Sequence, residues 1–519
     1  MSTLLARGAR SRSVVLSAVC LAALILPLSF SAGAIATPAI GLALHGGPMA
    51  LTWITNAFML AFGSCLMAAG TLADRFGRKR VFIGGVAAFT VISACLACAP
   101  TLLCLDLLRA AQGVAAAAAL AGGSAALAQE FDGHARTRAF GLLGITFGAG
   151  LALGPVLAGG LIEVFGWRAV FLSSALIGGL SLLLAAPGMR ETRDPAAASL
   201  DWPGIATFTT ALGLFTVAIL ESPQWGWRHP ATLTLLVGAV VALSAFVSIE
   251  RRAAQPMLAL ALFRYPRFIG VQLLPVATCY CYVVLLVILP LRFVGIEGHT
   301  PLDAGLMMIA LSAPMLVMPV LAMRLSRYTA PGTICSVGLL IAAAGLQWLG
   351  SVQIGATPTA ILGPMLLIGA GAGLPWGLMD GLAISVVPKE RAGMAAGIFS
   401  TTRVAGEGLA LAIVSALFST LTQISLHGAL PHANASQTTL MVEAAQRVAS
   451  GQLLSATTLL PGIGSPFLTL AYADAFRSLC HVLSIITVMS ALAVFVFLSR
   501  KPSPNAGLDA RRIVETQAP

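Results

Sequence analysis

The sequence predicts an α-helical protein that crosses a membrane about fourteen times. Only 9% of its 519 residues are charged and 58% are hydrophobic, whereas soluble domains carry about 25% charged residues. The apolar residues form blocks of helix length, unlike the alternating segments of ~10 residues that build transmembrane β-barrels. Composition and block length together exclude a soluble protein and a β-barrel.

Each block that supplies about 20 mostly apolar residues is interpreted as one membrane-spanning helix. Short loops separate most blocks, and the longest break, about 421–473, is expected to lie outside the membrane with a short helix near 439–450. In chain order, the expected spans are 13–35, 51–72, 81–100, 103–128, 138–162, 168–188, 203–221, 231–249, 267–290, 303–323, 331–351, 358–386, 392–420 and 474–498.

The 30 Lys and Arg residues sort to one set of loops, which indicates how the chain is oriented. The two termini and the loops after every second span contain 23 of them, and the opposite loops contain only five. Positively charged loops face the cytoplasm, so both termini are expected there. The net charge of +11 is therefore a topology signal and does not indicate nucleic-acid binding.

The loop between the second and third spans contains the most informative motif. Residues 70–80 read GTLADRFGRKR and resemble the loop-2/3 signature of the major facilitator superfamily at every consensus position. A glycine permits close helix approach, and an aspartate at a helix end can pair with an arginine or with the positive end of another helix. The resemblance implies a conformational switch formed by Gly70, Asp74, Arg75, Gly77 and Arg78.

Further motifs narrow the resemblance to antiporters. Residues 150–159 read GLALGPVLAG and resemble the span-5 antiporter motif G-x-x-x-G-P-x-x-G-G, with an alanine at one glycine position. Small residues and a proline permit tight packing and a bend in this span. The segments 201–204, 225–227 and 250–264 are similar to those of fourteen-span drug:H⁺ antiporters of the EmrB/QacA type. The residues that match the span-5 motif are Gly150, Gly154, Pro155 and Gly159.

This resemblance implies a major facilitator fold, with about fourteen transmembrane helices in two pseudo-symmetric six-helix halves plus two extra helices between them. In this fold a central cavity opens alternately to each side of the membrane. The expected organisation is a cytoplasmic N-terminus (1–12), a first six-helix half (13–188), a linker with the two extra helices (189–266), a second six-helix half that includes the outer loop (267–498) and a cytoplasmic tail (499–519).

One position in the first span departs from the family pattern. These antiporters often have an aspartate there, in a pattern similar to L-D-x-T, and the best local match is Leu28-Ser29-Phe30-Ser31. The uncharged Ser29 stands at the aspartate position, so proton coupling must use other groups.

Away from the ends of the expected spans there are only five charged residues, and each is a candidate for function because a charge at mid-bilayer costs at least ~2.5–3.5 kcal/mol. Asp106 and Arg109 are three residues apart, and Arg403 and Glu407 are four apart, so each pair shares one helix face. The alternative for each pair is an ion pair with a structural role only. The fifth residue is Asp380.

Asp380 is the strongest candidate for a proton carrier, because no charged residue of its own helix lies at helical spacing from it. It lies in the Gly-rich segment 369–381, which is expected to be kinked, on a span that lines the cavity in the superfamily. Burial disfavours the charged form of a carboxyl, which can therefore hold a proton until the site opens to a more basic side. The alternatives are an ion pair with an arginine on a neighbouring helix and a position near the cytoplasmic surface.

Arg109 and Gln112 resemble the span-4 motif R-x-x-Q-G, whose arginine helps proton transfer or fixes helix packing in the family. A lining of aromatic and methionine side chains suits varied apolar ligands. The alternative for such residues is a core or lipid-facing position. The cavity-lining candidates, together with Gln112, are Trp376, Met379, Tyr280, Tyr282 and Phe399.

These features predict a proton-coupled antiporter of the multidrug efflux type, which exports hydrophobic small molecules, cationic ones included, across an inner membrane. No metalloprotease, serine-hydrolase or nucleotide-binding motif is present, so we expect no enzyme activity, catalytic residue, metal site, cofactor or nucleic-acid partner. The expected partners are a small-molecule substrate, protons and the lipid bilayer; a periplasmic adaptor with an outer-membrane channel is a further candidate. The alternatives are a dedicated exporter of one metabolite or siderophore and a non-transporting receptor or scaffold.

Overall fold

In the part of the chain that the structure describes, fourteen helical stretches are long and apolar enough to cross a membrane, so the predicted number of spans and the all-α fold class are confirmed. The computed structural model describes residues 2–131, 133–193, 201–253, 260–386, 392–429, 435–460 and 464–498. Within these ranges all regular structure is helical. The predicted cytoplasmic tail, 499–519, lies outside them.

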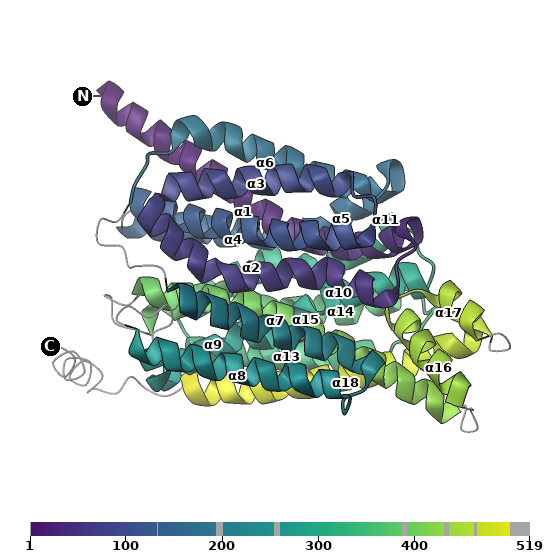
Figure 1. The fold of residues 1–519 in the computed structure, drawn as a ribbon. Coiled ribbons are helices and arrows are strands. Elements are labelled where there is room, and N and C mark those ends of the chain that lie inside the picture. Colours follow the sequence, from purple (N-terminus) through teal and green to yellow (C-terminus); the bar gives the residue numbers. More distant parts are fainter. Residues whose placement is uncertain are drawn as a thin grey trace.

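The first half is a bundle of six helices in the upper part of Figure 1. Its first helix begins ten residues or more before the predicted start of the first span and continues through Pro27 and Pro38. The six helices are α1 (Ser2–Leu44), α2 (Pro48–Phe76), α3 (Arg78–Ala97), α4 (Leu102–Glu130), α5 (Gly133–Phe165) and α6 (Arg168–Gly188).

The two extra helices, α7 (Trp202–Trp225) and α8 (Pro230–Arg252), pack against each other. The Asp201 side chain begins α7 by accepting a hydrogen bond of 2.9 Å from the Gly204 amide. α7 also packs against α2 of the first half and α15 of the second, so it covers the seam where these two helices meet.

The second half lies in the lower part of Figure 1 and also contributes six spans. Its first span includes two π-helical turns, which lie close to Pro275 and Pro290, residues that cannot donate a backbone hydrogen bond. The elements are η1 (Leu260–Arg264), α9 (Pro266–Thr278), η2 (Cys279–Val283), α10 (Leu285–Pro290), η3 (Leu291–Ile296), α11 (Pro301–Ser312), α12 (Pro314–Leu325), α13 (Pro331–Ser351), α14 (Pro358–Ser385), α15 (Ala392–Ala429), α16 (Ala435–Ala449), α17 (Leu453–Leu459) and α18 (Ser465–Leu498).

The two ends of the bundle differ. The start of α1 and the end of α18 lie at one end, called here the terminal end, and α16 and α17 lie at the other, the distal end (Figure 1). The expected loop 421–473 is largely helical: α15 and α18 are longer than predicted, and α16 and α17 lie between them. Polar residues such as Thr422 suggest a loop in the sequence, but its hydroxyl donates to the Phe418 carbonyl one turn back and so stays within α15.

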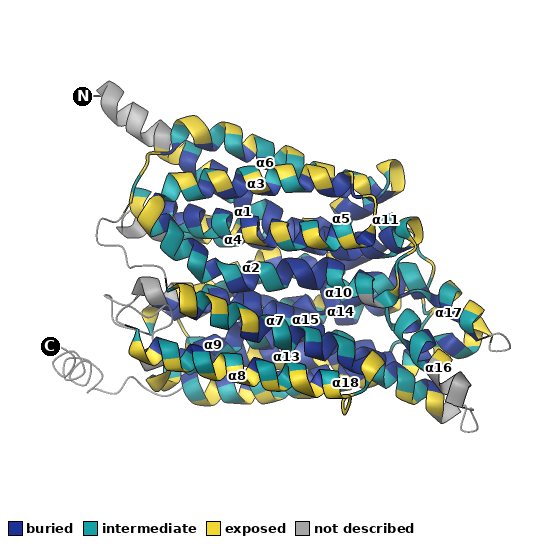
Figure 2. Cartoon of the chain, viewed as in Figure 1, coloured by how far each residue is buried: buried dark blue, intermediate teal, exposed yellow. Residues whose placement is uncertain are grey.

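Burial follows the position of each helix in the bundle. Figure 2 shows exposed residues along the outward faces of α3, α6 and α8, and mostly buried residues along α10, α14 and α15. The outward face of α8 presents Val237, Val240 and Val241, which are apolar and exposed, as expected of a surface that contacts lipid. The polar residues that matter for function are therefore those on the inward faces.

Candidate functional site

Arg109 of α4 is fully buried and is the centre of a polar cluster in the first half. Its guanidinium donates hydrogen bonds to the Ile54 carbonyl (2.8 Å), the Ser29 hydroxyl (3.2 Å) and the Gln112 side-chain oxygen (2.6 Å). Gln112 in turn donates to the Ser93 hydroxyl at 2.8 Å. Four helices, α1 to α4, therefore hold this one cation in place.

Among the residues that the structure describes, no carboxylate forms a hydrogen bond or an ion pair with Arg109, although Asp106 of the same helix interacts with it electrostatically. Asp106 forms no ion pair with it, and one Asp106 carboxyl oxygen is buried without a hydrogen-bond partner. The guanidinium instead lies over the Phe58 ring, 4.4 Å from its centroid, and its Nη2 atom has no partner. The uncharged Ser29 thus contacts the arginine where the family pattern has an aspartate.

Charged residues in the second half pair differently from the expectation drawn from helical spacing. Arg403 forms its ion pair with Asp380 of α14, with Nη1 and Oδ1 3.3 Å apart, and not with Glu407 on its own helix. An ion pair with an arginine on a neighbouring helix is one of the two alternatives to a proton-carrier role for Asp380, and this is the pair that the structure contains. The Asp380 side chain is 55% exposed, whereas that of Arg403 is 10% exposed. Arg403 also lies over the ring of Phe147 on α5, 5.2 Å from its centroid, so it connects the two halves.

Glu407 is a buried carboxyl without a bonded partner. The residue is only 6% exposed, and in the described part of the chain it makes no hydrogen bond or ion pair. Arg403, one turn away on α15, and Cys279 of η2 are the groups with which it interacts electrostatically. Burying a carboxylate without hydrogen bonds is costly, so Glu407 is a candidate for a functional role.

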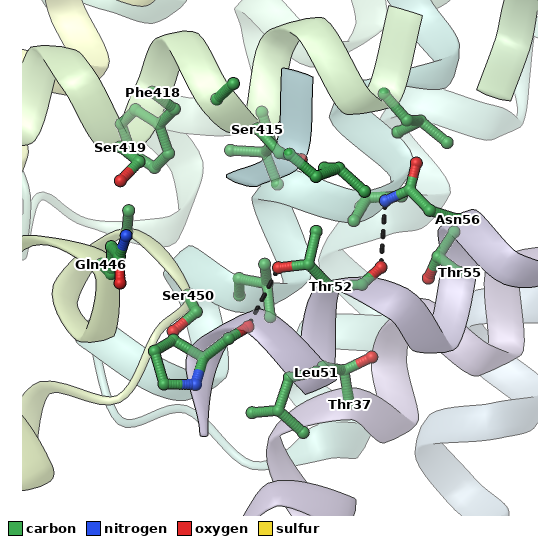
Figure 3. Close-up of a pocket in the computed structure, with 18 of the residues that line it drawn as sticks. Thr37, Leu51, Thr52, Thr55, Asn56, Ser415, Phe418, Ser419, Gln446 and Ser450 are labelled. Carbon is green, nitrogen blue, oxygen red and sulfur yellow. Dashed lines mark hydrogen bonds between the residues drawn. The ribbon is translucent and has the colours of Figure 1, made fainter. Parts of the chain in front are cut away.

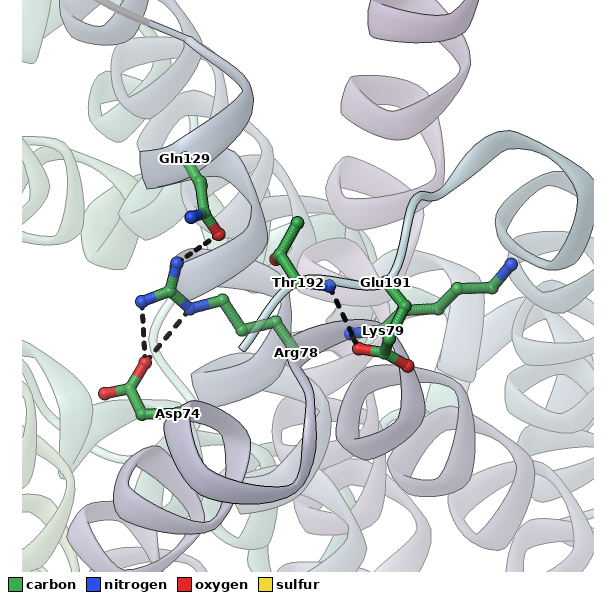
Figure 4. A network of polar contacts seen from close by, with 6 residues as sticks. All are labelled: Asp74, Arg78, Lys79, Gln129, Glu191 and Thr192. Atoms are coloured by element: carbon green, nitrogen blue, oxygen red, sulfur yellow. Dashed lines mark hydrogen bonds and ion pairs between the residues drawn. The ribbon is translucent and has the colours of Figure 1, made fainter. Parts of the chain in front are cut away.

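The motif of residues 70–80, between the second and third spans, forms a polar network at the terminal end (Figure 4). Arg78 holds Asp74 with two hydrogen bonds, of 2.8 and 3.0 Å, and also donates to Gln129 of α4. The backbone amide of Lys79 donates to Glu191 at 3.2 Å, which ties the loop to the segment after α6. All these contacts lie within the first half and the segment that directly follows it.

The two glycines of this motif have different environments. Gly77 has φ +116°, which other residues rarely adopt, and a side chain there would collide with the Glu191 carboxylate. Gly70, by contrast, has open space where a Cβ would lie, so the close helix approach expected there is not found in this conformation. The Arg75 side chain packs over the neighbouring Phe76 ring at the exposed surface.

The glycines of the span-5 motif contact helices of both halves. A Cβ on Gly150 would lie 2.5 Å from the Leu24 carbonyl oxygen of α1, and one on Gly159 would lie 2.3 Å from the Pro301 carbonyl oxygen of α11. Gly154 also faces α1. Gly159 is near the distal end of α5, and Pro301 begins α11, so this contact closes the two halves against each other at the distal end.

The residues expected to line an aromatic cavity lie in the packed interior of the second half. Met379 and Tyr282 are fully buried and Phe399 is 1% exposed. Trp376 packs against Tyr282 with ring centroids 6.3 Å apart. Together with the half-buried Tyr280, all belong to one hydrophobic core, and none lines either of the two cavities described for this structure.

A polar pocket that the motifs did not predict lies near the distal end, between the two halves (Figure 3). It has a volume of about 80 Å³ and is lined from α1, α2, α7, α10, η3, α15 and α16. Its polar groups are hydroxyls and amides. A signal was present in the sequence, because Thr52, Thr55 and Asn56 are spaced so that they share a face of the second span.

Among the residues that the structure describes, no cluster of His, Cys, Asp and Glu is arranged to hold a metal ion. The fold and these sites define a polytopic membrane protein of two helical halves, with charged and polar groups buried between the helices. Such an arrangement is typical of a transporter that alternates between two conformations.

Comparison with known proteins identifies the family. The sequence model of the family described as Major Facilitator Superfamily matches residues 19–411. The multidrug resistance protein Stp of Mycobacterium tuberculosis (strain CDC 1551 / Oshkosh) is 31% identical over 388 residues, which cover 74% of this chain and 72% of Stp. The tetracenomycin C resistance and export protein of Streptomyces glaucescens is 30% identical, over 80% of this chain and 77% of its own.

A solved structure has the same fold. The bacterial homologue of the human lysosomal transporter Spinster superimposes with a TM-score of 0.64 at 16% identity, over 95% of this chain and 99% of that chain. The chain therefore belongs to the Major Facilitator Superfamily. It is a multi-pass membrane transporter of small molecules, as the sequence predicted.

Proposed function

We propose that the protein is a drug efflux transporter, which exports hydrophobic small molecules across a plasma (inner) membrane with both termini in the cytoplasm. The observation that carries this proposal is its similarity, over about three quarters of its length, to proteins named for multidrug resistance and for resistance and export. Because one of these relatives is named for a single compound, a dedicated exporter is the second candidate. The breadth of the substrate panel separates the two.

Transport proceeds by alternating access, in which the distal contact between the halves closes and reopens. The close approach of Gly159 to Pro301, and the hydrogen bond of 3.1 Å from Gln452 to the Gly46 carbonyl, tie the halves together at this end. With the termini in the cytoplasm, the distal end faces outward, so this conformation is closed toward the outside. Release of substrate requires these contacts to separate.

Export is driven by protons, and Glu407 is the residue that we propose carries them. It is buried and unbonded, whereas Asp380 is half-exposed and already paired with Arg403. A carboxyl that is neutral while buried can release its proton when its site opens to a more basic compartment. One proton that enters down about 150 mV releases about 3.5 kcal/mol, which supports a gradient of roughly several hundredfold for a neutral substrate.

The test uses everted membrane vesicles with an imposed pH gradient and a panel of lipophilic cations and neutral compounds. We expect vesicles with the wild-type protein to accumulate lipophilic cations, neutral compounds or both. Glu407→Gln is expected to abolish accumulation, because the amide has no proton to exchange, and Asp380→Asn to retain most of it. If no compound accumulates above empty vesicles, drug efflux is wrong; if Glu407→Gln transports normally, its role as carrier is wrong.

A further inference from the structure

The polar pocket near the distal end lies between helices of the two halves. Its walls come from the distal parts of α2 and α15, and it is covered by Gln446 of α16 and by Ser450, the residue after this helix (Figure 3). On the side nearer the terminal end, Gly63 of α2 packs directly against Ala405 of α15. The pocket therefore lies between this contact on its terminal side and α16 on its distal side.

Two buried polar atoms in this pocket lack partners. The side-chain oxygen of Asn56 accepts no hydrogen bond, although the Asn56 amide nitrogen is fixed by donating to the Thr52 carbonyl at 2.9 Å. The Ser419 hydroxyl, on the opposite wall, likewise has no partner. The two residues are 3% and 7% exposed. Buried polar atoms are almost always hydrogen-bonded, so two unbonded ones in a single pocket are available to bind a polar molecule.

Further polar groups in the pocket are also available. The hydroxyls of Thr55 and Ser415 make no hydrogen bond to other described residues. Neither does the side chain of Gln446, which can both donate and accept. These groups extend the hydrogen-bonding surface from α2 across α15 to α16.

None of the described residues that line the pocket carries a charge. A cation that entered it would lose its hydration shell and gain no carboxylate in exchange, which is unfavourable. An uncharged molecule with hydroxyl or carbonyl groups would lose less and would satisfy Asn56 and Ser419. The chemistry of the walls therefore selects neutral ligands.

We propose that this pocket is an outward-side binding site for uncharged molecules that carry hydroxyl or keto groups, with Asn56 and Ser419 as hydrogen-bonding partners. The proposal rests on the proposed export function and adds the substrate class to it. The cavity of about 80 Å³ is smaller than pockets for drug-sized ligands, which measure roughly 300–1,000 Å³. A drug-sized ligand therefore fits this pocket only when α2 and α15 move apart and the pocket becomes larger.

The test measures ligand binding and thermal unfolding of the purified full-length protein. The probes are neutral compounds with hydroxyl and keto groups, such as hydrocortisone, and lipophilic cations, such as tetraphenylphosphonium. Asn56→Leu and Ser419→Ala are each expected to weaken binding of the neutral probes about three- to tenfold, and to leave cation binding unchanged. The matched control is Ser244→Ala on the exposed face of α8, which should bind as wild type does.

The unfolding temperature separates a ligand site from a structural role. Because the Ser419 hydroxyl has no hydrogen-bond partner, Ser419→Ala should leave the unfolding temperature unchanged or raise it. Asn56→Leu also removes the hydrogen bond to the Thr52 carbonyl, so that variant is judged by its binding alone. A fall in unfolding temperature without weaker neutral binding would mean a structural role and would overturn the proposal. The proposal would also be overturned if neither variant weakened the binding of neutral probes, or if the protein bound cations alone. In either case, accumulation of a compound in vesicles would still support the export function. Failure of every compound to accumulate would instead contradict the export function itself.

Discussion

Adding one methyl group at Gly159 should prevent the two halves from closing at the distal end. A Cβ on Gly159 would lie 2.3 Å from the Pro301 carbonyl oxygen and 3.0 Å from the Cα of Leu302, whereas ordinary contacts begin at 3.4 Å. The obstacles are backbone atoms, so no side chain can rotate away. To accept Gly159→Ala, α5 and α11 must separate by about 1 Å.

Overpacking of this kind costs about 1–3 kcal/mol, which disfavours the distally closed state roughly five- to 150-fold. Gly159→Ala is therefore expected to reduce proton-driven accumulation of substrate in everted vesicles about tenfold. The matched control is Gly160→Ala, because the nearest atom to its Cβ is a flexible Leu302 methyl at 3.8 Å. Equal transport by the two variants, at equal amounts in the membrane, would refute the role of this contact.

Two further substitutions test the first half. Ser29→Asp should stabilise the protein by about 1–3 kcal/mol, since it gives the buried Arg109 a hydrogen-bonded carboxylate in place of a hydroxyl. An unchanged or lower unfolding temperature would contradict this reasoning. Gly77→Ala should cost about 1–3 kcal/mol, through its positive φ and the collision with Glu191, and should slow efflux. Gly70→Ala, at an open position, should do neither, and similar effects of the two glycine substitutions would contradict the assigned strain.

The helical architecture could be predicted from the sequence because the bilayer permits few alternatives. A backbone within lipid must satisfy its own hydrogen bonds, so each long apolar block becomes one helix. The ends of helices were less predictable. Outside the membrane, polar residues of a long helix resemble those of a loop, as in the segment that became the end of α15, α16, α17 and the start of α18.

The site was predictable where contacts are local and unpredictable where they depend on packing between helices. The spacing of Arg109 and Gln112 on one helix agrees with their hydrogen bond, but Ser93 and the Ile54 carbonyl come from other helices. The spacing of Arg403 and Glu407 suggests an ion pair that does not form. A spacing of four residues makes an ion pair between Arg403 and Glu407 possible, but Arg403 pairs instead with Asp380 on α14.

The central claim, that Glu407 couples export to protons, is tested most directly by comparing active accumulation with exchange in proteoliposomes. Substrate exchange across a membrane without a pH gradient needs the alternating conformations but no net proton transfer. We predict that Glu407→Gln exchanges labelled for unlabelled substrate at close to the wild-type rate and no longer accumulates substrate when a pH gradient is imposed. Accumulation by Glu407→Gln at the wild-type level, with the same number of protons moved per substrate, would contradict the account.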